Sequence, residues 1–495
     1  MPSTDPDRPN VIVILTDDQG YWAMGCAGNE ELRTPNLDHL AATGIRFENF
    51  FCVSPVCSPA RASLLTGRIP SQHGVHDWLS AGNSTCEPER DGELTEYLAG
   101  QTAYTDLLAG AGYVCGMSGK WHLGDAHHPQ KSFTYWNVHA RAGGSYYEAP
   151  MVADEERVYL EPRYITDVFT DNALGFLDAQ TGGEAPFYLS LHYTAPHSPW
   201  SRKNHPPKVF ESYYEDCPFE SVPDEPMHPW ARPNREFFSG PEKRREYLSG
   251  YFAAVEAMDA NVGRVLDWLE RHRLRENTLI FFTSDNGMNM GHHGICGKGN
   301  GTRPMNMFET SVKVPALVSR PGHLPEGMVS DGLFSHYDFM PTLLDYVGVP
   351  NPEADALPGR SFAPLLRGED QPGREDVVVF DEYGPVRMIR TPRWKYVHRH
   401  PNGPHELYDL SEDPDERSDL YGRPEHRPLI DELHARMDGW FDRYVVPELD
   451  GNTLPVTGFG QVGRAREHHK GGEPFSKDFP GGWWREPMSL WLKEE

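Results

Sequence analysis

The stretch that decides the fold lies near the N-terminus, where residues 11–20 read VIVILTDDQG. Five apolar, mostly β-branched residues in a row are typical of a strand that is buried on both faces of a sheet. The run leads into Asp17 and Asp18. Two carboxylates directly after a buried strand are costly unless a cation or a basic partner compensates them. We therefore expect a central strand whose carboxyl end carries a functional site.

The rest of the first 350 residues repeats an order of amphipathic helix followed by apolar strand. The pattern predicts strands at residues 45–50, 113–118, 187–192, 279–283 and 314–318, and helices at residues 94–111, 169–177, 251–269 and 338–347. This alternation indicates an α/β fold, with a large mixed, mostly parallel sheet flanked by helices. In such sheets ligands bind beyond the carboxyl ends of the strands, so polar residues that follow different strands converge on one site.

The pattern changes after residue 364. Short strands at residues 377–380, 386–390 and 394–397, with another at 406–410, precede a helix at residues 429–444. We expect residues 1–365 to form the main, catalytic domain and residues 366–495 to form a smaller α+β domain, with an antiparallel sheet, a helix and an extended tail. The tail either wraps back over the main domain or ends loosely. Residues 200–241 lack clear periodicity and predict an elaborated loop region that shapes specificity.

Charge and cysteine content exclude several classes of function. The chain has 46 Lys and Arg against 73 Asp and Glu, a formal charge of −27, so neither nucleic acid nor an anionic membrane is an expected partner. Its seven cysteines are scattered and lack a CxxC pair, which argues against a disulfide framework or a thiolate zinc site. Without a hydrophobic signal core, the chain as given is expected to be cytoplasmic, or periplasmic or secreted if a signal peptide was removed.

Residues 57–68, CSPARASLLTGR, place a cysteine at the start of an expected helix. An anion is held well at a helix N-terminus, and Arg61, one turn after Cys57, lies on the same helix face. Cys57 is therefore a candidate nucleophile beside an anion site. Taken alone, it equally suits a buried structural cysteine ahead of an ordinary helix.

Oxygen ligands follow two of the expected strands. Asp17 and Asp18 follow the first strand, and Asp285 and Asn286 follow the strand at residues 279–283. An all-oxygen set suits a hard cation, Ca²⁺ or Mg²⁺, rather than zinc. Each pair alone is also typical of turns, but two pairs at the same edge of one sheet favour a metal site.

Four further side chains complete the set of candidates. Lys120 and Lys298, together with Arg61, can neutralise a tetrahedral anion. His122 and His197 are candidates for proton transfer, because the unperturbed pKa of histidine lies near neutrality. The alternative for each residue is an ordinary surface or turn position.

Together these motifs resemble the sulfatase family of the alkaline-phosphatase-like superfamily. Residues 57–68 are similar to the family's Cys-x-Pro-x-Arg signature, which a formylglycine-generating enzyme reads during maturation, although Ala60 stands where serine is frequent. Further matches are residues 119–124 (GKWHLG), 196–199 (PHSP), 284–287 (SDNG), 297–299 (GKG) and 334–345 (FSHYDFMPTLLD). The motifs run in order from about residue 9 to about residue 421.

The resemblance implies an enzyme, a sulfuric ester hydrolase that cleaves the S–O bond and releases inorganic sulfate. It implies that Cys57 is converted to formylglycine, whose hydrate is the nucleophile, and that Ca²⁺, with Mg²⁺ less favoured, is the cofactor. The metal ligands that it implies are Asp17, Asp18, Asp285, Asn286 and the modified Cys57. The catalytic roles that it implies are support of the hydrate by Arg61 and Lys120, contact with the sulfate by Lys298, transfer of the hydroxyl proton by His122 and protonation of the leaving alcohol by His197.

Two other functions stay open at this point. A phosphonate monoester or phosphodiester hydrolase of the same superfamily would use the same modified cysteine, and a non-catalytic binding protein would keep Cys57 as a thiol. For a sulfatase, the expected substrate is a small anionic sulfated molecule, and we expect a saccharide that stacks on the aromatic residues of segment 200–241. His292 and His293 match the family only loosely and receive no role.

Overall fold

The computed structural model describes residues 8–80, 94–153, 157–232, 234–382, 384–467 and 474–476. Within them, the largest element is an 11-stranded sheet with the order β11-β2-β12-β8-β1-β7-β3-β4-β5-β6, in which β13 also pairs with β2. The central strands β8, β1, β7, β3 and β4 are parallel, whereas β12 and β5 join the sheet in the antiparallel direction. The predicted α/β class, with a large mixed sheet, is confirmed.

The sheet and its helices have the following bounds. The strands are β1 (Asn10–Asp17), β2 (Gly44–Phe51), β3 (Val114–Lys120), β4 (Tyr135–His139), β5 (Ala149–Ala153), β6 (Arg157–Glu161), β7 (Phe187–Pro196), β8 (Thr278–Ser284), β11 (Lys313–Val314), β12 (Ala316–Ser319) and β13 (Met328–Ser335). The helices are α1 (Pro35–Ala42), α2 (Cys57–Thr66), α3 (Pro70–His73), α4 (Tyr104–Gly110), α5 (Ile165–Gln180), α6 (Pro207–Asp216), α7 (Pro241–Arg271), α8 (Glu309–Val312), α9 (Phe339–Tyr346) and α10 (Ala363–Leu366).

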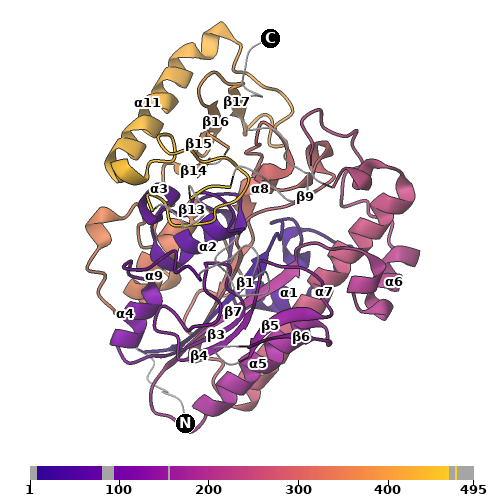
Figure 1. Ribbon diagram of the computed structural model, residues 1–495, viewed down its shortest axis with the longest axis vertical. Coiled ribbons are helices and arrows are strands. Elements are labelled where there is room, and N and C mark those ends of the chain that lie inside the picture. Colours follow the sequence, from indigo (N-terminus) through magenta and orange to yellow (C-terminus); the bar gives the residue numbers. More distant parts are fainter. Residues whose placement is uncertain are drawn as a thin grey trace.

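Strand β1 lies at the centre of this fold, and all eight of its residues are buried. Its alternate side chains enter two different cores, as the period of two in a strand requires. Val11, Val13 and Leu15 pack in the core that includes α2, α4 and α9, and Ile12 and Ile14 pack in the core that includes α1, α5 and α7. Helices therefore cover both faces of the sheet (Figure 1).

The register of the central strands aligns their carboxyl ends. Thr16 of β1 pairs with Ser284 at the end of β8, and Gly119 of β3 pairs with His192 of β7. The residues that follow these strands therefore emerge at one edge of the sheet, beside the N-terminus of α2. This arrangement positions the site described below.

A second sheet follows the first in the chain. Strands β14 (Val377–Asp381), β15 (Val386–Arg390), β16 (Trp394–Arg399) and β17 (Glu406–Asp409) are antiparallel, and α11 (Arg427–Tyr444) packs on them. Their shared core includes Phe380, Ile389, Met437 and Phe441. The predicted antiparallel sheet and helix are confirmed, and the division into domains at residue 365 stays a prediction.

The tail returns to the segment that follows α3, over the part of the tail that the structure describes. Gln461 pairs with Leu79 in an isolated β-bridge, and its backbone N–H donates to the carbonyl of Trp78 at 2.8 Å. Figure 1 shows this segment in yellow beside α3. The wrapping alternative is thus confirmed for these residues, and residues 477–495 lie outside the described ranges.

Three local predictions need correction. The helix predicted at residues 94–111 begins only at Tyr104, because Gly100 adopts a left-handed φ of 75° and the Asp106 carboxylate caps the later start by accepting the Ala103 N–H at 2.9 Å. The strand predicted at residues 314–318 is broken at Pro315, which has no N–H to donate to the sheet. The segment 200–241 is more regular than a loop, since α6 lies within it. None of the helices described is long and apolar enough to cross a bilayer.

Candidate active site

The site is built around Cys57, the first residue of α2. All ten residues of this helix are buried, and it ends at Gly67, whose φ of 67° is left-handed. Arg61, one turn after Cys57, donates from Nε to Oδ2 of Asp285 at 2.9 Å and from Nη1 to the carbonyl of Lys120 at 3.1 Å. The helix N-terminus and Arg61 therefore face the carboxyl ends of β8 and β3, as the sequence predicts.

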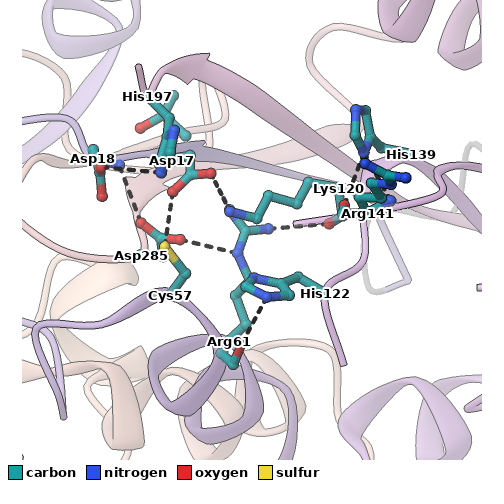
Figure 2. A network of polar contacts seen from close by, with 12 residues as sticks. Asp17, Asp18, Cys57, Arg61, Lys120, His122, His139, Arg141, His197 and Asp285 are labelled. Carbon is teal, nitrogen blue, oxygen red and sulfur yellow. Dashed lines mark hydrogen bonds and ion pairs between the residues drawn. The ribbon is translucent and has the colours of Figure 1, made fainter. Parts of the chain in front are cut away.

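Three carboxylates meet at this point. Ligand atoms of Asp17, Asp18, Asp285 and Cys57 all lie within 4.8 Å of one another (Figure 2). The Cys57 thiol donates to Oδ1 of Asp17 at 3.2 Å, and the backbone N–H of Asp18 donates to Oδ1 of Asp285 at the same distance. Asp18 adopts a φ of 63°, which turns the chain sharply after β1. The two acidic strand ends therefore form one cluster.

Asn286 supplies the observation that fits this cluster to a cation. Its amide nitrogen donates to Oδ1 of Asp18 at 2.8 Å and to the carbonyl of Gly287 at 2.9 Å. Its Oδ1 is buried and has no hydrogen-bond partner among the described residues. An unpartnered amide oxygen beside three carboxylates is the donor set that a hard divalent cation takes. The cluster can therefore hold a metal ion.

Basic side chains of the protein itself balance the charges of the three carboxylates. Lys120 forms an ion pair with Asp17, Lys298 forms one with Asp18, and Arg61 pairs with Asp285. Burial alone would raise the pKa of Asp17 and of Asp18. The charge of Lys120 nevertheless holds the pKa of Asp17 below its ordinary value, and the charge of Lys298 does the same for Asp18. Three negative charges are thus matched by three positive ones, and a divalent cation would leave the site positive.

The Cys57 thiol is a poor nucleophile in this setting. Burial, and then the charge of Asp17, raise its pKa well above the ordinary value for cysteine. The Nζ of Lys298 lies 2.8 Å from the sulfur, but its opposing effect on the thiol pKa is smaller. Because the thiolate is the reactive form of cysteine, an unmodified Cys57 is a weakly reactive thiol here.

The two candidate histidines occupy different positions. His197 follows β7, and its Nε2 lies 3.6 Å from Oδ2 of Asp18, at the border of the metal cluster. Its Nδ1 lies 2.8 Å from the carbonyl of Ser198, which can only accept, so Nδ1 carries a proton and Nε2 faces the cluster. The side chain is 29% exposed. His197 is therefore the candidate that a substrate can reach.

His122 is buried and approaches Cys57 indirectly. Its Nε2 lies 3.1 Å from the carbonyl of Leu79 and 3.2 Å from the hydroxyl of Ser58, the residue after Cys57. Burial, and then the charge of Lys120, hold the pKa of His122 well below its ordinary value, so the ring is neutral. Its Nδ1 has no hydrogen-bond partner in the described parts of the chain. The structure thus brings every predicted site residue to this edge of the sheet, with His122 behind Ser58.

Sequence reasoning missed the residues that hold His122 in place. Leu79 donates its N–H to the Ser58 hydroxyl at 3.2 Å and accepts from His122 through its carbonyl. Gln461 holds the same segment from the far end of the chain, since its side chain accepts the His76 N–H and donates to the carbonyl of Gly74, both at 2.9 Å. A contact across more than 380 residues leaves no local pattern in the sequence, so no signal pointed to Gln461.

A cavity of about 550 Å³ opens beside His197. Part of its lining comes from segment 200–241, predicted as the source of specificity, and part from the first turns of α7, which were not predicted to contribute. The lining includes Trp200, Ser201, Asn234, Glu236, Lys243, Glu246 and Tyr247. His292 and His293 lie elsewhere and pack on aromatic rings, His292 against Trp22 and His293 against Phe308.

Comparison with known proteins gives the family. A model of the sulfatase family matches residues 9–349, and a model of the C-terminal region of N-sulphoglucosamine sulphohydrolase matches residues 302–442. The N-acetylglucosamine-6-O-sulfatase of Bacteroides thetaiotaomicron is 28% identical over 86% of this chain and 85% of its own. The N-acetylgalactosamine-6-sulfatase of Canis lupus familiaris is 31% identical over 73% of this chain and 67% of its own.

A solved structure agrees with this result. It holds a protein in complex with its substrate D-glucosamine-2-N,6-O-disulfate, and it superimposes with a TM-score of 0.72 and 26% identity over 90% of this chain and all of that chain. The matches cover the sheet, the Cys57 segment and both acidic strand ends. The chain therefore belongs to the sulfatase family of sulfuric ester hydrolases.

Proposed function

We propose that the protein hydrolyses the sulfate ester of a saccharide by S–O cleavage, with formylglycine at position 57 and Ca²⁺ in the acidic cluster. The observation that carries this proposal is the position of Cys57. Its sulfur is hydrogen-bonded to Asp17 and Lys298 at the start of a buried helix, where an unmodified thiol stays protonated. Such a position does not suit a cysteine that reacts as a thiolate. It suits a cysteine that is the precursor of formylglycine.

Two of the relatives support a saccharide as the leaving group. Their names are those of enzymes acting on N-acetylglucosamine-6-sulfate and N-acetylgalactosamine-6-sulfate units. In this chain, the cavity beside His197 offers the partly buried ring of Tyr247, which packs on the buried Trp200, together with the polar groups of Ser201 and Asn234. Aromatic faces and short polar side chains are a combination that suits the apolar and hydroxyl faces of a sugar ring.

The Cys57 sulfur stands where the oxygens of a formylglycine hydrate would lie. A hydrate supplies one hydroxyl that attacks the sulfur atom of the sulfate ester and a second hydroxyl whose deprotonation releases sulfate. A plain thiol or a single hydroxyl cannot release sulfate in this way. All residues of α2 are buried in the fold, so we propose that the formylglycine-generating enzyme, the maturation partner, reads residues 57–68 before the chain folds.

The basic residues take complementary roles in this proposal. Lys298, next to the position 57 side chain, contacts a sulfate oxygen, and Lys120 and Arg61 hold Asp17 and Asp285 in place beside the nucleophile. His122 is neutral and donates from Nε2 to the Leu79 carbonyl, so its unpartnered Nδ1 is the atom that accepts the hydroxyl proton of the hydrate. His197 gives a proton to the leaving oxygen from the mouth of the cavity.

Five side chains would hold the cation: Asp17, Asp18, Asp285, Asn286 and Cys57 in its modified form. The unpartnered Asn286 Oδ1 and the all-oxygen set favour Ca²⁺, with Mg²⁺ less favoured because it demands stricter geometry. When bound, the cation would draw negative charge from the sulfate and lower the pKa of the attacking hydroxyl.

Matched esters test the proposal. Protein produced together with a formylglycine-generating enzyme is assayed for inorganic sulfate released from 6-sulfated N-acetylhexosamines and from 4-nitrophenyl sulfate, and for hydrolysis of the matched phenylphosphonate and phosphodiester. We expect kcat/KM to be highest for a sulfated saccharide. A higher kcat/KM for the phosphonate or the phosphodiester would favour the alternative activity, and turnover of the aryl sulfate alone would contradict the saccharide assignment.

A further inference from the structure

The cavity beside His197 carries a net negative charge. Three side chains that are charged at neutral pH line it: Glu236, Lys243 and Glu246. Lys243 Nζ lies 2.8 Å from Oε2 of Glu246, so these two charges compensate each other. Glu236 is exposed, and the structure gives its carboxylate no ion pair within the described ranges. One uncompensated carboxylate therefore remains at the cavity wall.

The other lining groups do not offset this charge. Gly143, Gly144, Ser198, Ser201 and Asn234 offer neutral hydrogen-bonding groups, and Trp200 and Tyr247 offer rings whose centroids lie 5.6 Å apart. Among the described lining residues, Lys243 is the sole lysine or arginine, and it is already paired. Burial, and then the charge of Glu236, raise the pKa of the Tyr247 hydroxyl, as expected where a negative field reaches the interior of the cavity.

This polarity is opposite to that of the cluster around Cys57. There, Lys120, Lys298 and Arg61 gather at the point where the reacting sulfate would lie. With a divalent cation in the cluster, this end of the site would be cationic and would take one anionic group, whereas the cavity beyond His197 is acidic. A substrate with a second sulfate or a carboxylate on its leaving group would place that charge near Glu236 and Glu246.

We propose that this cavity selects a leaving alcohol that is neutral or cationic, such as a hydroxylated sugar unit or one with a free amine, and disfavours a second anionic group. The proposal rests on the proposed function and narrows its substrate class to singly sulfated units. It separates this chain from the protein solved with D-glucosamine-2-N,6-O-disulfate, whose substrate carries a second sulfate.

Three aryl sulfates of different charge test the preference directly. Phenyl sulfates with a para aminomethyl, hydroxymethyl or carboxymethyl group differ in charge, the methylene weakens the electronic effect on the leaving oxygen, and each kcat/KM is divided by the rate constant of uncatalysed hydrolysis of the same ester to remove the remainder. We expect kcat/KM to fall from the cationic to the neutral to the anionic ester, by about three- to tenfold between the two ends, because the groups are partly exposed. Added salt should reduce this ratio, since it screens exposed charges.

Variants assign the preference to named residues. Glu236→Gln should reduce the ratio towards one, and Lys243→Met, which frees Glu246, should increase it. Glu242→Gln is the matched control, because Glu242 lies in the first turn of α7 and does not line the cavity. Equal values for the three esters, a preference for the carboxymethyl ester, or a ratio unchanged in Glu236→Gln would overturn the inference. Absence of sulfate release from all three esters would instead contradict the proposed function.

Discussion

The Lys298 ammonium lies 2.8 Å from the Cys57 sulfur and is also paired with Asp18. One lysine thus joins the candidate nucleophile to the candidate metal cluster. Both contacts are buried, with 10% of the Lys298 side chain and 7% of the Asp18 side chain exposed. Lys298 is therefore placed to act on the reacting group while it balances a carboxylate.

Lys298→Met should lower kcat/KM for sulfate esters by at least about 100-fold, because the charge that contacts the reacting sulfate is lost. Retention of Ca²⁺ should not fall, since removal of a cation leaves the cluster more negative. Steady-state sulfate release and metal content check the two results. Lys203→Met, at an exposed lysine, is the control. Activity of Lys298→Met within threefold of the wild type would remove Lys298 from the catalytic set.

Removal of the metal should abolish sulfate release without unfolding the protein. The three carboxylates retain Lys120, Lys298 and Arg61 as partners, so the empty cluster is electrically balanced. Dialysis against a chelator, followed by addition of Ca²⁺ or Mg²⁺, should restore activity more fully with Ca²⁺. The melting temperature should rise with Ca²⁺ in the wild type.

The same titration on Asp18→Ala should show no Ca²⁺-dependent rise in melting temperature, whereas Asp331→Asn, at an exposed carboxylate of β13, should behave as the wild type. Full activity of the wild type after chelation would contradict the metal assignment.

Gln461→Ala should lower kcat and leave KM nearly unchanged. Its side chain holds the segment that contains Leu79, whose carbonyl positions His122, and it does not line the cavity. The control is Thr457→Ala, because the Thr457 hydroxyl donates to Ser476 in the tail itself. Equal kcat values for the two variants would show that the tail stabilises the fold without positioning His122.

Stability should fall as pH rises through a window set by Glu382. Burial raises the pKa of Glu382 to about 7, against the opposing charge of Arg387. Its pKa in the unfolded chain is about 4.3, so between these values the folded state binds the extra proton. The free energy of unfolding should therefore decrease by up to about 4 kcal/mol across this window.

Glu382→Gln mimics the protonated side chain and should flatten this dependence, so that the variant is the more stable protein at pH 8. Denaturant unfolding between pH 5 and pH 8 checks the slope, with Glu448→Gln on the exposed surface as the control. A slope that is equal in the wild type and Glu382→Gln would show that Glu382 is ionised throughout.

The site was largely predictable because its residues follow strands. Asp17, Lys120, His197 and Asp285 each come directly after or at the end of an apolar run, and parallel strands place such residues at one edge. The sequence could also indicate Cys57, since the motif around it is local. The α/β class followed from the same alternation of helices and strands.

The remaining features depend on contacts that leave no periodic signal. Gln461 reaches Leu79 from the other end of the chain, and Glu246 lines the cavity from a helix whose sequence shows only the pattern of burial. The α6 helix was missed because Pro206 precedes it and Pro207 is its first residue, although its buried Phe210 and Tyr213 have helical spacing. The late start of α4 depends on one glycine and one cap, and element boundaries of this kind are weakly encoded.

The state of position 57 tests the central claim most directly. Preparations with graded formylglycine content, measured by mass spectrometry of the peptide that contains residue 57, are assayed for sulfate released per molecule. The account predicts a rate proportional to the formylglycine fraction, with a line that passes through the origin. Sulfate release that is independent of this fraction, or that persists when every molecule carries an unmodified Cys57, would contradict it.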